Sequence, residues 1–232
     1  MFGPPNNLSF RPLVSPTVET PRDVEILPAR RKLLQEGRRC DELFVVHRGW
    51  LVAFRQLPDG GRQIFNFWLP GEICGAELIA IRTAPYCVAT MTACHLSRLS
   101  REILAKREAD TSIALAALAC RTSLILRERI VGLGRRSAPV RVAHLLLELT
   151  HRCRNGAGDE LLPLTQLEVA DSTGLTETYV NRIFRIMRDR GQLEVSREGL
   201  RLLDAARLMR EVQFNPAYLD EGRIPIGDFL AT

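Results

Sequence analysis

The segment TGLTETYVNRIFRIMRDRG, residues 173–191, decides the fold. Its apolar side chains recur three or four positions apart, at Val180, Ile183, Phe184 and Met187. That spacing is typical of one packed face of an α-helix. The arginines of the same segment fall mostly off this face. The pattern therefore predicts a helix that packs on one side and presents guanidinium groups on the other.

The residues before this helix, LTQLEVADSTG at 164–174, predict a shorter helix and a tight turn. Thr165 is followed three residues later by Glu168, a capping-box pattern that marks a helix start. Gly174 suits the left-handed backbone at a helix end, and Thr176 is a suitable cap for the next helix. A helix of about two turns, a turn with glycine and then a longer helix are typical of a helix-turn-helix.

The flanking segments complete a small domain. QLEVSREGLRLL, residues 192–203, predicts two short strands around a turn, which form a β-wing. A last helix is predicted for DAARLMREV, and a longer one for VRVAHLLLELTHRC, whose start is marked by Ser137 and Pro139. We expect a winged helix-turn-helix domain at 135–213 and a C-terminal tail at 214–232.

The side of the predicted helix that does not pack carries residue types that suit DNA binding. A helix in a major groove uses its N-terminal side chains on base edges, where arginine pairs with guanine, asparagine with adenine and glutamate with cytosine. The predicted DNA-contacting residues are Thr165, Gln166, Thr176, Glu177, Thr178, Asn181, Arg182 and Arg185. The alternative is a solvated amphipathic helix, because Glu177 and Asp189 reduce the charge of its four arginines to +2.

Residues 24–100 are rich in Val, Phe and Trp, which favours β-strands. Turn signals interrupt them at Arg48-Gly49, at Asp59-Gly60 and at Pro70-Gly71, and the second of these predicts a hairpin. YCVATMTACHLSRLS, residues 86–100, is expected to be one further strand. Short strands at steady spacing predict a small barrel or jelly roll, and we assign a β-roll domain to 23–108.

A long helix is predicted next, at 109–134, with Thr111 or Ser112 as its cap and glycines 132 and 134 at its end. A short helix starting near Ser100 is expected to precede it. The long helix is apolar over three or more turns and must hide its surface in a core or in a two-helix seam across a dimer axis. Two registers fit such a seam, namely Ile113, Ala117, Cys120, Leu124 and Val131, or Leu115, Ala119, Thr122 and Leu126.

Composition narrows the class of protein. The 232-residue chain has a net charge of +5, which permits a polyanionic partner without requiring one. It shows no signal peptide and no apolar run of membrane-spanning length, and residues 1–22 are expected to be disordered. Its six cysteines and four histidines are dispersed, so we expect a cytoplasmic protein with reduced thiols and no metal site. No catalytic motif is present, so an enzyme is not expected.

Together these segments resemble the Crp/Fnr family of bacterial transcription regulators. The resemblance runs from about residue 24 to about residue 213 and includes the Val-x-Arg pattern at Val180 and Arg182. It implies an α+β fold with a sensor β-roll, a long dimerisation helix and a winged helix-turn-helix. It also implies a homodimer, a twofold-symmetric DNA site and contact with RNA polymerase.

The same resemblance implies roles for individual residues. Arg182 matches the family arginine that reads a guanine in each half-site, and Glu177 and Thr178 match the two other base-reading positions. The chain departs from the family pattern in two ways. The usual glutamate falls one residue earlier, at Glu177 rather than at Thr178, and Asn181 replaces a small residue.

The predicted sensor domain departs further from the family pattern. Cyclic-AMP-binding members carry Gly-Glu-Leu and then an arginine about ten residues later, which holds the phosphate. Here Glu77 can stand for the acid, but Arg82 lies only five residues on and residues 84–87 are Ala-Pro-Tyr-Cys. The candidate effector residues are Glu77, Arg82, Tyr86 and Cys87, and the pattern argues against cyclic AMP.

Other cofactors of the family lack a signature here. No cysteine precedes Cys40, which argues against the N-terminal iron–sulfur cluster of some members, although Cys40, Cys74, Cys87 and Cys94 could converge in the fold. Haem ligation, for example by His47, stays open. Control by an unidentified small effector, by a redox-active cysteine or by expression level alone also stays open.

We therefore predict a dimeric, sequence-specific DNA-binding transcription regulator. The β-roll is expected to set the packing of the long helix, with a hinge near residues 132–137. A small-molecule or redox sensor that acts mainly through protein contacts is the alternative.

Overall fold

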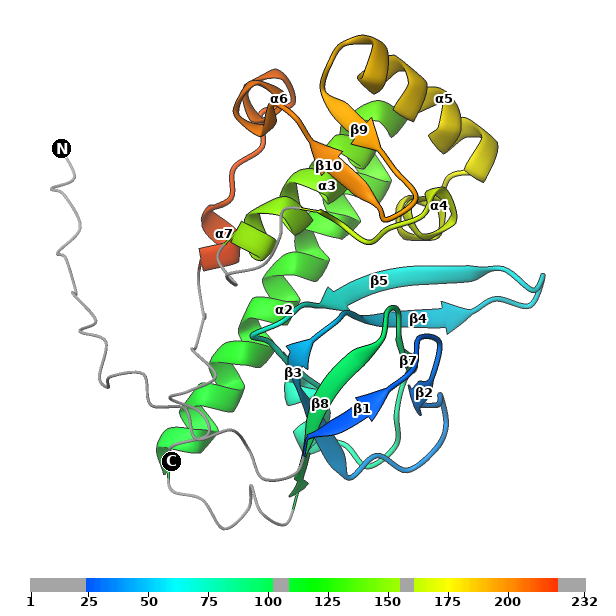
Figure 1. Cartoon of the computed structure of the whole chain (residues 1–232). Helices are drawn as coiled ribbons and strands as arrows, with labels where there is room; N and C mark the ends of the chain where they lie inside the picture. Colours follow the sequence, from blue (N-terminus) through cyan, green and yellow to red (C-terminus); the bar gives the residue numbers. More distant parts are fainter. Residues whose placement is uncertain (1–23, 102–108, 155–160, 221–232) are drawn as a thin grey trace, which may run out of the picture.

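The computed structural model describes residues 24–101, 109–154 and 161–220. The predictions for residues 1–22, for the short helix near 102–108 and for the end of the tail lie outside the described residues. A β-roll forms the lower half of Figure 1, a long helix runs along it, and the C-terminal helices and wing lie above it. The α+β fold predicted from the sequence is confirmed. Among the described residues no helix is both long and apolar enough to cross a membrane.

Two four-stranded antiparallel sheets face each other in the β-roll. One contains, in order, β1 (Glu25–Leu27), β8 (Cys94–Ser100), β3 (Glu42–Arg48) and β6 (Ile73–Cys74). The other contains β2 (Lys32–Leu34), β7 (Cys87–Thr90), β4 (Leu51–Gln56) and β5 (Arg62–Trp68). Because side chains alternate along a strand, each sheet turns one face inward. Phe44 and Val46 of β3 meet Leu51 and Ala53 of β4 there, and Trp68 joins the same core.

The predicted hairpin is confirmed, and one predicted strand is wrong. Gly60 joins β4 to β5 with a φ of 86°, which a residue with a side chain rarely adopts. Residues 86–100 do not form one strand, because a turn at 91–93 separates β7 from β8. Trp50 holds this turn: its backbone carbonyl accepts from the Met91 N–H, and its N–H donates to the Thr92 hydroxyl.

A 3-10 helix, η1 (Ala76–Ala80), follows β6, and the long helix α2 (Ala109–Arg135) packs against it and against the outer face of the first sheet. The predicted caps of α2 are wrong, since the helix starts before Thr111, whereas its end at Arg135 lies one residue past the predicted Gly134. Carbonyls at this end have a partner: the Arg141 guanidinium donates to those of residues 132 and 133 in α2 and to that of residue 136, just after it.

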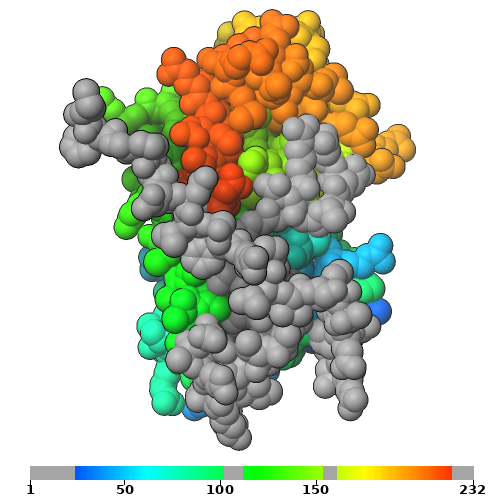
Figure 2. Space-filling view, turned by 90° about the vertical axis from the view of Figure 1, so that its left-hand side faces the viewer, coloured from blue at the N-terminus to red at the C-terminus, as the bar shows by residue number. Residues whose placement is uncertain are grey.

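The C-terminal domain contains α3 (Ala138–Arg154), α4 (Gln166–Thr173), α5 (Glu177–Asp189), β9 (Leu193–Val195), β10 (Leu200–Leu202), α6 (Ala205–Glu211) and α7 (Ala217–Asp220). It stacks on the β-roll, as Figure 2 shows from the side. One hydrophobic cluster joins the two, with Phe54 and Phe67 from the roll, Ile125 from α2 and Phe184 from α5. The described start of the predicted tail also packs, because Phe214 and Leu219 are buried in this cluster.

Candidate DNA-binding surface

The helix-turn-helix is built by local caps. The Thr165 side chain accepts from the Glu168 N–H, and the Glu168 carboxylate accepts from the Thr165 N–H at 2.7 Å, so the capping box is complete. Gly174 ends α4 with a φ of 63°, and the Thr176 hydroxyl caps α5 by accepting from the Tyr179 N–H at 3.3 Å. These predicted features are confirmed. They fix where α5 begins and how it leaves α4.

Helix α5 has the two faces that the sequence predicts. Val180, Ile183, Phe184 and Met187 are buried, and they hold the helix against α4 and the wing. The side chains between them are exposed. The packed face therefore sets the orientation of the exposed one.

The exposed face lines an open hollow of about 690 Å³. Its lining residues are Gln166, Thr176, Glu177, Thr178, Tyr179, Asn181, Arg182 and Arg185. Thr165 lies in the adjoining groove, which shares Glu177 with the hollow. The structure thus brings the residues predicted to contact DNA onto one surface. Tyr179 was not predicted, although its place one turn before Arg182 and three residues after Thr176 puts it on the same face.

The hollow carries free positive charge. In residues 24–101, 109–154 and 161–220, neither Arg182 nor Arg185 forms an ion pair, and both are exposed. Glu177 is the one acid on the lining. Unpaired guanidinium groups beside polar side chains suit a polyanion with readable edges, since phosphates position the protein and base edges specify the sequence.

The candidate effector residues are only partly brought together. The Tyr86 hydroxyl donates to one oxygen of Glu77, and burial followed by the charge of Glu77 raises the pKa of Tyr86. The other Glu77 oxygen, Oε2, is buried without a hydrogen-bond partner in the described part of the chain. Arg82 is exposed, and Cys87 lies on the outer face of β7 beside Phe54 and Ala89, away from the inner core.

Most of the cysteines are buried. Burial raises the pKa of the Cys40, Cys74 and Cys94 thiols, which disfavours the reactive thiolate. Cys120, on α2, is exposed. Where the structure describes the chain, no three His, Cys, Asp or Glu side chains gather as a metal site would require.

The two predicted registers of α2 point in different directions. Leu115 of the second register is buried against the chain's own β-roll, together with Val45 and Leu99. In the first register, Ile113 is 69% exposed and Val131 is 44% exposed. Cys120 is exposed as well. Ala117 and Leu124 of the first register are half-buried, as are Ala119, Thr122 and Leu126 of the second.

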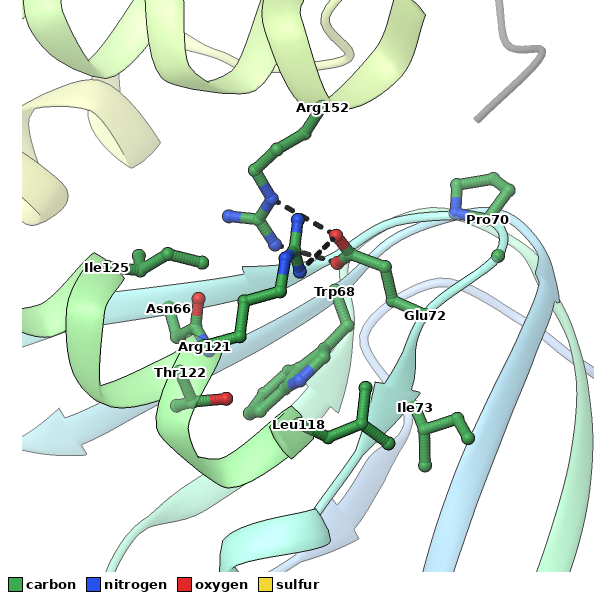
Figure 3. Close-up of a pocket in the computed structure, with 11 residues that line it drawn as sticks. Asn66, Trp68, Pro70, Glu72, Ile73, Leu118, Arg121, Thr122, Ile125 and Arg152 are labelled. Atoms are coloured by element: carbon green, nitrogen blue, oxygen red, sulfur yellow. Dashed lines mark hydrogen bonds and ion pairs between the residues drawn. The ribbon is translucent and has the colours of Figure 1, made fainter. Parts of the chain in front are cut away.

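A buried ion network links the β-roll to the C-terminal domain (Figure 3). Glu72, in the turn between β5 and β6, accepts from Arg121 of α2 at 3.0 Å and from Arg152 of α3 at 2.7 Å. Arg152 also pairs with Glu148 at 2.8 Å, and Arg129 of α2 reaches the same Glu148 at 2.9 Å. Burial alone would raise the pKa of Glu72, but Arg152 and Arg121 lower it to about 2. The carboxylate therefore stays charged inside the protein.

Two further contacts hold the helix-turn-helix in place. Arg62 of β5 pairs with Asp171 of α4 at 2.6 Å. Arg141 of α3 donates to the carbonyl of Thr173 at 2.6 Å while it caps the end of α2. The end of α2 and the turn of the helix-turn-helix are thus tied to one guanidinium.

Comparison with known proteins agrees with this geometry. Residues 140–211 match the family model of the Crp-like helix-turn-helix domain, and residues 24–107 match that of the cyclic nucleotide-binding domain. The nitrogen fixation regulation protein FixK of Bradyrhizobium diazoefficiens is 32% identical over 167 residues, 70% of each chain. The chain belongs to the Crp/Fnr family. It is a DNA-binding transcription regulator.

Other Crp/Fnr proteins show the same likeness. The FixK protein of Rhizobium meliloti is 28% identical over 187 residues, 80% of this chain and 85% of that one. The solved structure of FixK2 from Bradyrhizobium japonicum superimposes with a TM-score of 0.74 over 81% of this chain and 96% of that one, at 24% identity. This likeness bears out the fold of the Crp/Fnr regulator described above.

The sequence pattern does not indicate the ion network between the β-roll and the C-terminal domain. Its acids and arginines come from 72, 121, 129, 148 and 152, and most of them are far apart along the chain. The one local signal is the spacing of Glu148 and Arg152, which puts an ion pair on one helix face.

Proposed function

We propose that the chain binds a twofold-symmetric DNA site as a homodimer and reads each half-site with the exposed face of α5. The observation that carries this proposal is the hollow in which Arg182, free of any ion pair within the described residues, lies beside Asn181 and Gln166. Arg182 would pair with guanine through N7 and O6. Arg185, further along the helix, would meet a phosphate.

The first register of α2, in which Ile113, Cys120 and Val131 are exposed, supports the dimer. The steps between Ile113, Ala117, Cys120, Leu124 and Val131 are four, three, four and seven residues, which fits a heptad seam. A second copy of the same helix face would cover these side chains. The pair would then present two α5 helices to successive major grooves about 34 Å apart.

The packing around η1 supports control by the β-roll. Helix α2 contacts η1 through Ala114, Leu115 and Leu118, and Glu72 of the ion network lies only three residues before Gly75, where η1 begins. A conformational change between Glu72 and η1 would alter the contacts that this segment makes with both α2 and α3. We propose that it alters the position of the helix-turn-helix and with it the contact with RNA polymerase at the promoter, in the cytoplasm.

The buried, unpartnered Oε2 of Glu77 favours a small effector that brings a hydrogen-bond donor. Cyclic AMP fits poorly, because Trp68, Phe44 and Leu51 fill the inside of the roll and Arg82 is exposed. The same oxygen supports the second candidate function, a small-molecule sensor that acts through protein contacts. A thermal shift by a metabolite that leaves DNA binding unchanged would favour that candidate.

A gel-shift titration against genomic fragments tests the proposed function. We expect some fragments to bind as two chains per site and to resist a random-DNA competitor. Equal affinity for all fragments at every salt concentration would contradict it, because binding to phosphates alone carries no sequence preference.

A further inference from the structure

One hydrogen bond crosses the helix-turn-helix on its outer side. The Asn181 Nδ2 of α5 donates to the Oε1 of Gln166, the first residue of α4, at 3.0 Å. Both side chains line the hollow that carries Arg182. The hydrogen bond does not join core residues, since Asn181 is exposed and Gln166 is half-buried.

This bond leaves Asn181 with a defined set of free atoms. A side-chain amide has two N–H donors and one oxygen acceptor. One N–H is used by Gln166, so one N–H and Oδ1 remain. A donor beside an acceptor is the arrangement that pairs with adenine, whose N7 accepts and whose N6 donates.

The orientation of Asn181 depends on that of Gln166. If the Gln166 amide turned around, its Nε2 would donate to Asn181 Oδ1. That oxygen would then face Gln166 instead of the base, and Asn181 would present its N–H donors to the groove. Phosphate oxygens accept hydrogen bonds but do not donate them. A phosphate beside the start of α4 would therefore draw Nε2 outward and leave Oε1 facing Asn181.

We infer that Gln166 is a positioning residue, which orients the Asn181 amide so that each half-site is read as adenine beside the guanine of Arg182. The inference rests on the proposed function, because it needs α5 in a major groove. It deepens that function by naming the second base. A chain of hydrogen bonds would select this base: a phosphate orients Gln166, Gln166 orients Asn181, and Asn181 pairs with adenine.

Selection from a randomised half-site library, read by quantitative sequencing, tests the inference with the full-length chain. The variants are Asn181→Ala, Gln166→Leu, which removes the acceptor, and Gln166→Glu, which keeps an acceptor for Asn181. We expect the wild type to prefer adenine next to the guanine by roughly ten-fold. Gln166→Leu should lose most of this preference, as Asn181→Ala does, while the guanine preference stays.

Gln166→Glu separates positioning from phosphate contact. It should bind all sequences more weakly, because a carboxylate near phosphate repels it, yet keep the adenine preference. If Gln166→Leu lowers the affinity for all sequences equally and leaves the adenine preference intact, Gln166 is a phosphate contact only and the inference is wrong. An unchanged preference in Asn181→Ala would also overturn it. Loss of every base preference in the wild type, guanine included, would instead contradict the proposed function.

Discussion

The carboxylate of Glu72 in the β-roll lies 2.7 Å from the guanidinium of Arg152 in the C-terminal domain, and the Arg152 side chain is 1% exposed. An ion pair taken this far out of water is costly to break on one side only, because the remaining charge is left without compensation. The pair therefore fixes how the two domains meet. It also offers a direct test of that junction.

Glu72→Gln should lower the free energy of unfolding by about 3–5 kcal/mol, because Arg152 and Arg121 lose the charge they share. Urea unfolding at neutral pH measures the loss. The matched control is Glu42→Gln, which removes one acid from an exposed pair with Arg98 and should cost at most about 1 kcal/mol. Equal effects of the two substitutions would show that the buried network does not hold the domains together.

The same carboxylate predicts a pH dependence. The pKa of Glu72 is lowered from its usual 4.5 to about 2, so the unfolded chain takes up this proton at a higher pH than the folded one. Its contribution is fully present above about pH 4.5 and is lost as the pH falls toward about 2, a change of about 3 kcal/mol. The difference in unfolding free energy between wild type and Glu72→Gln should therefore be constant from pH 7 to pH 5 and clearly smaller at pH 3. A difference as large at pH 3 as at pH 7 would count against a charged Glu72.

Alanine substitutions at two glycines test the backbone conformation at those positions. Gly174→Ala should destabilise the protein by about 1–2 kcal/mol, since a φ of 63° is unfavourable for a residue with a side chain. Gly134→Ala should instead stabilise it by about 0.5–1 kcal/mol, because Gly134 lies in a helix with nothing within 4 Å of the added carbon. Both values come from denaturant unfolding. A neutral Gly174→Ala would mean that the turn between α4 and α5 does not need its left-handed residue.

The register of the proposed dimer can be tested by disulfide cross-linking between two copies of the chain. Cys120 is exposed in the first register of α2, so mild oxidation should join two chains through Cys120. Cys120→Ser should abolish the cross-link. Adding Thr122→Cys to Cys120→Ser moves the thiol to the second register, toward the pocket beside Glu72 and Arg121, and should not restore it. Cross-linking through residue 122 and not through residue 120 would contradict the proposed register.

The parts of the fold that could be predicted from the sequence are those set by nearby residues. The capping box at Thr165, the turn at Gly174 and the hairpin at Gly60 each depend on a few neighbouring positions, and all three are found. The split of residues 86–100 into two strands could not be predicted, because Trp50, about forty residues away, holds the turn. The ion network at Glu72 depends in the same way on α2 and α3 together. The residues of the candidate DNA surface are set largely by local sequence and can be predicted from it, whereas the contacts that position this surface against the β-roll are not local.

The most direct test of the central claim is the ratio of specific to non-specific DNA affinity in wild type and in Arg182→Ala. The measurement is fluorescence anisotropy with a selected genomic site and with random DNA of equal length, at one salt concentration. We predict that Arg182→Ala weakens binding to the selected site by about 1–3 kcal/mol and barely changes binding to random DNA. Equal weakening on both DNAs, or no change on the selected site, would contradict Arg182 as the residue that reads the site.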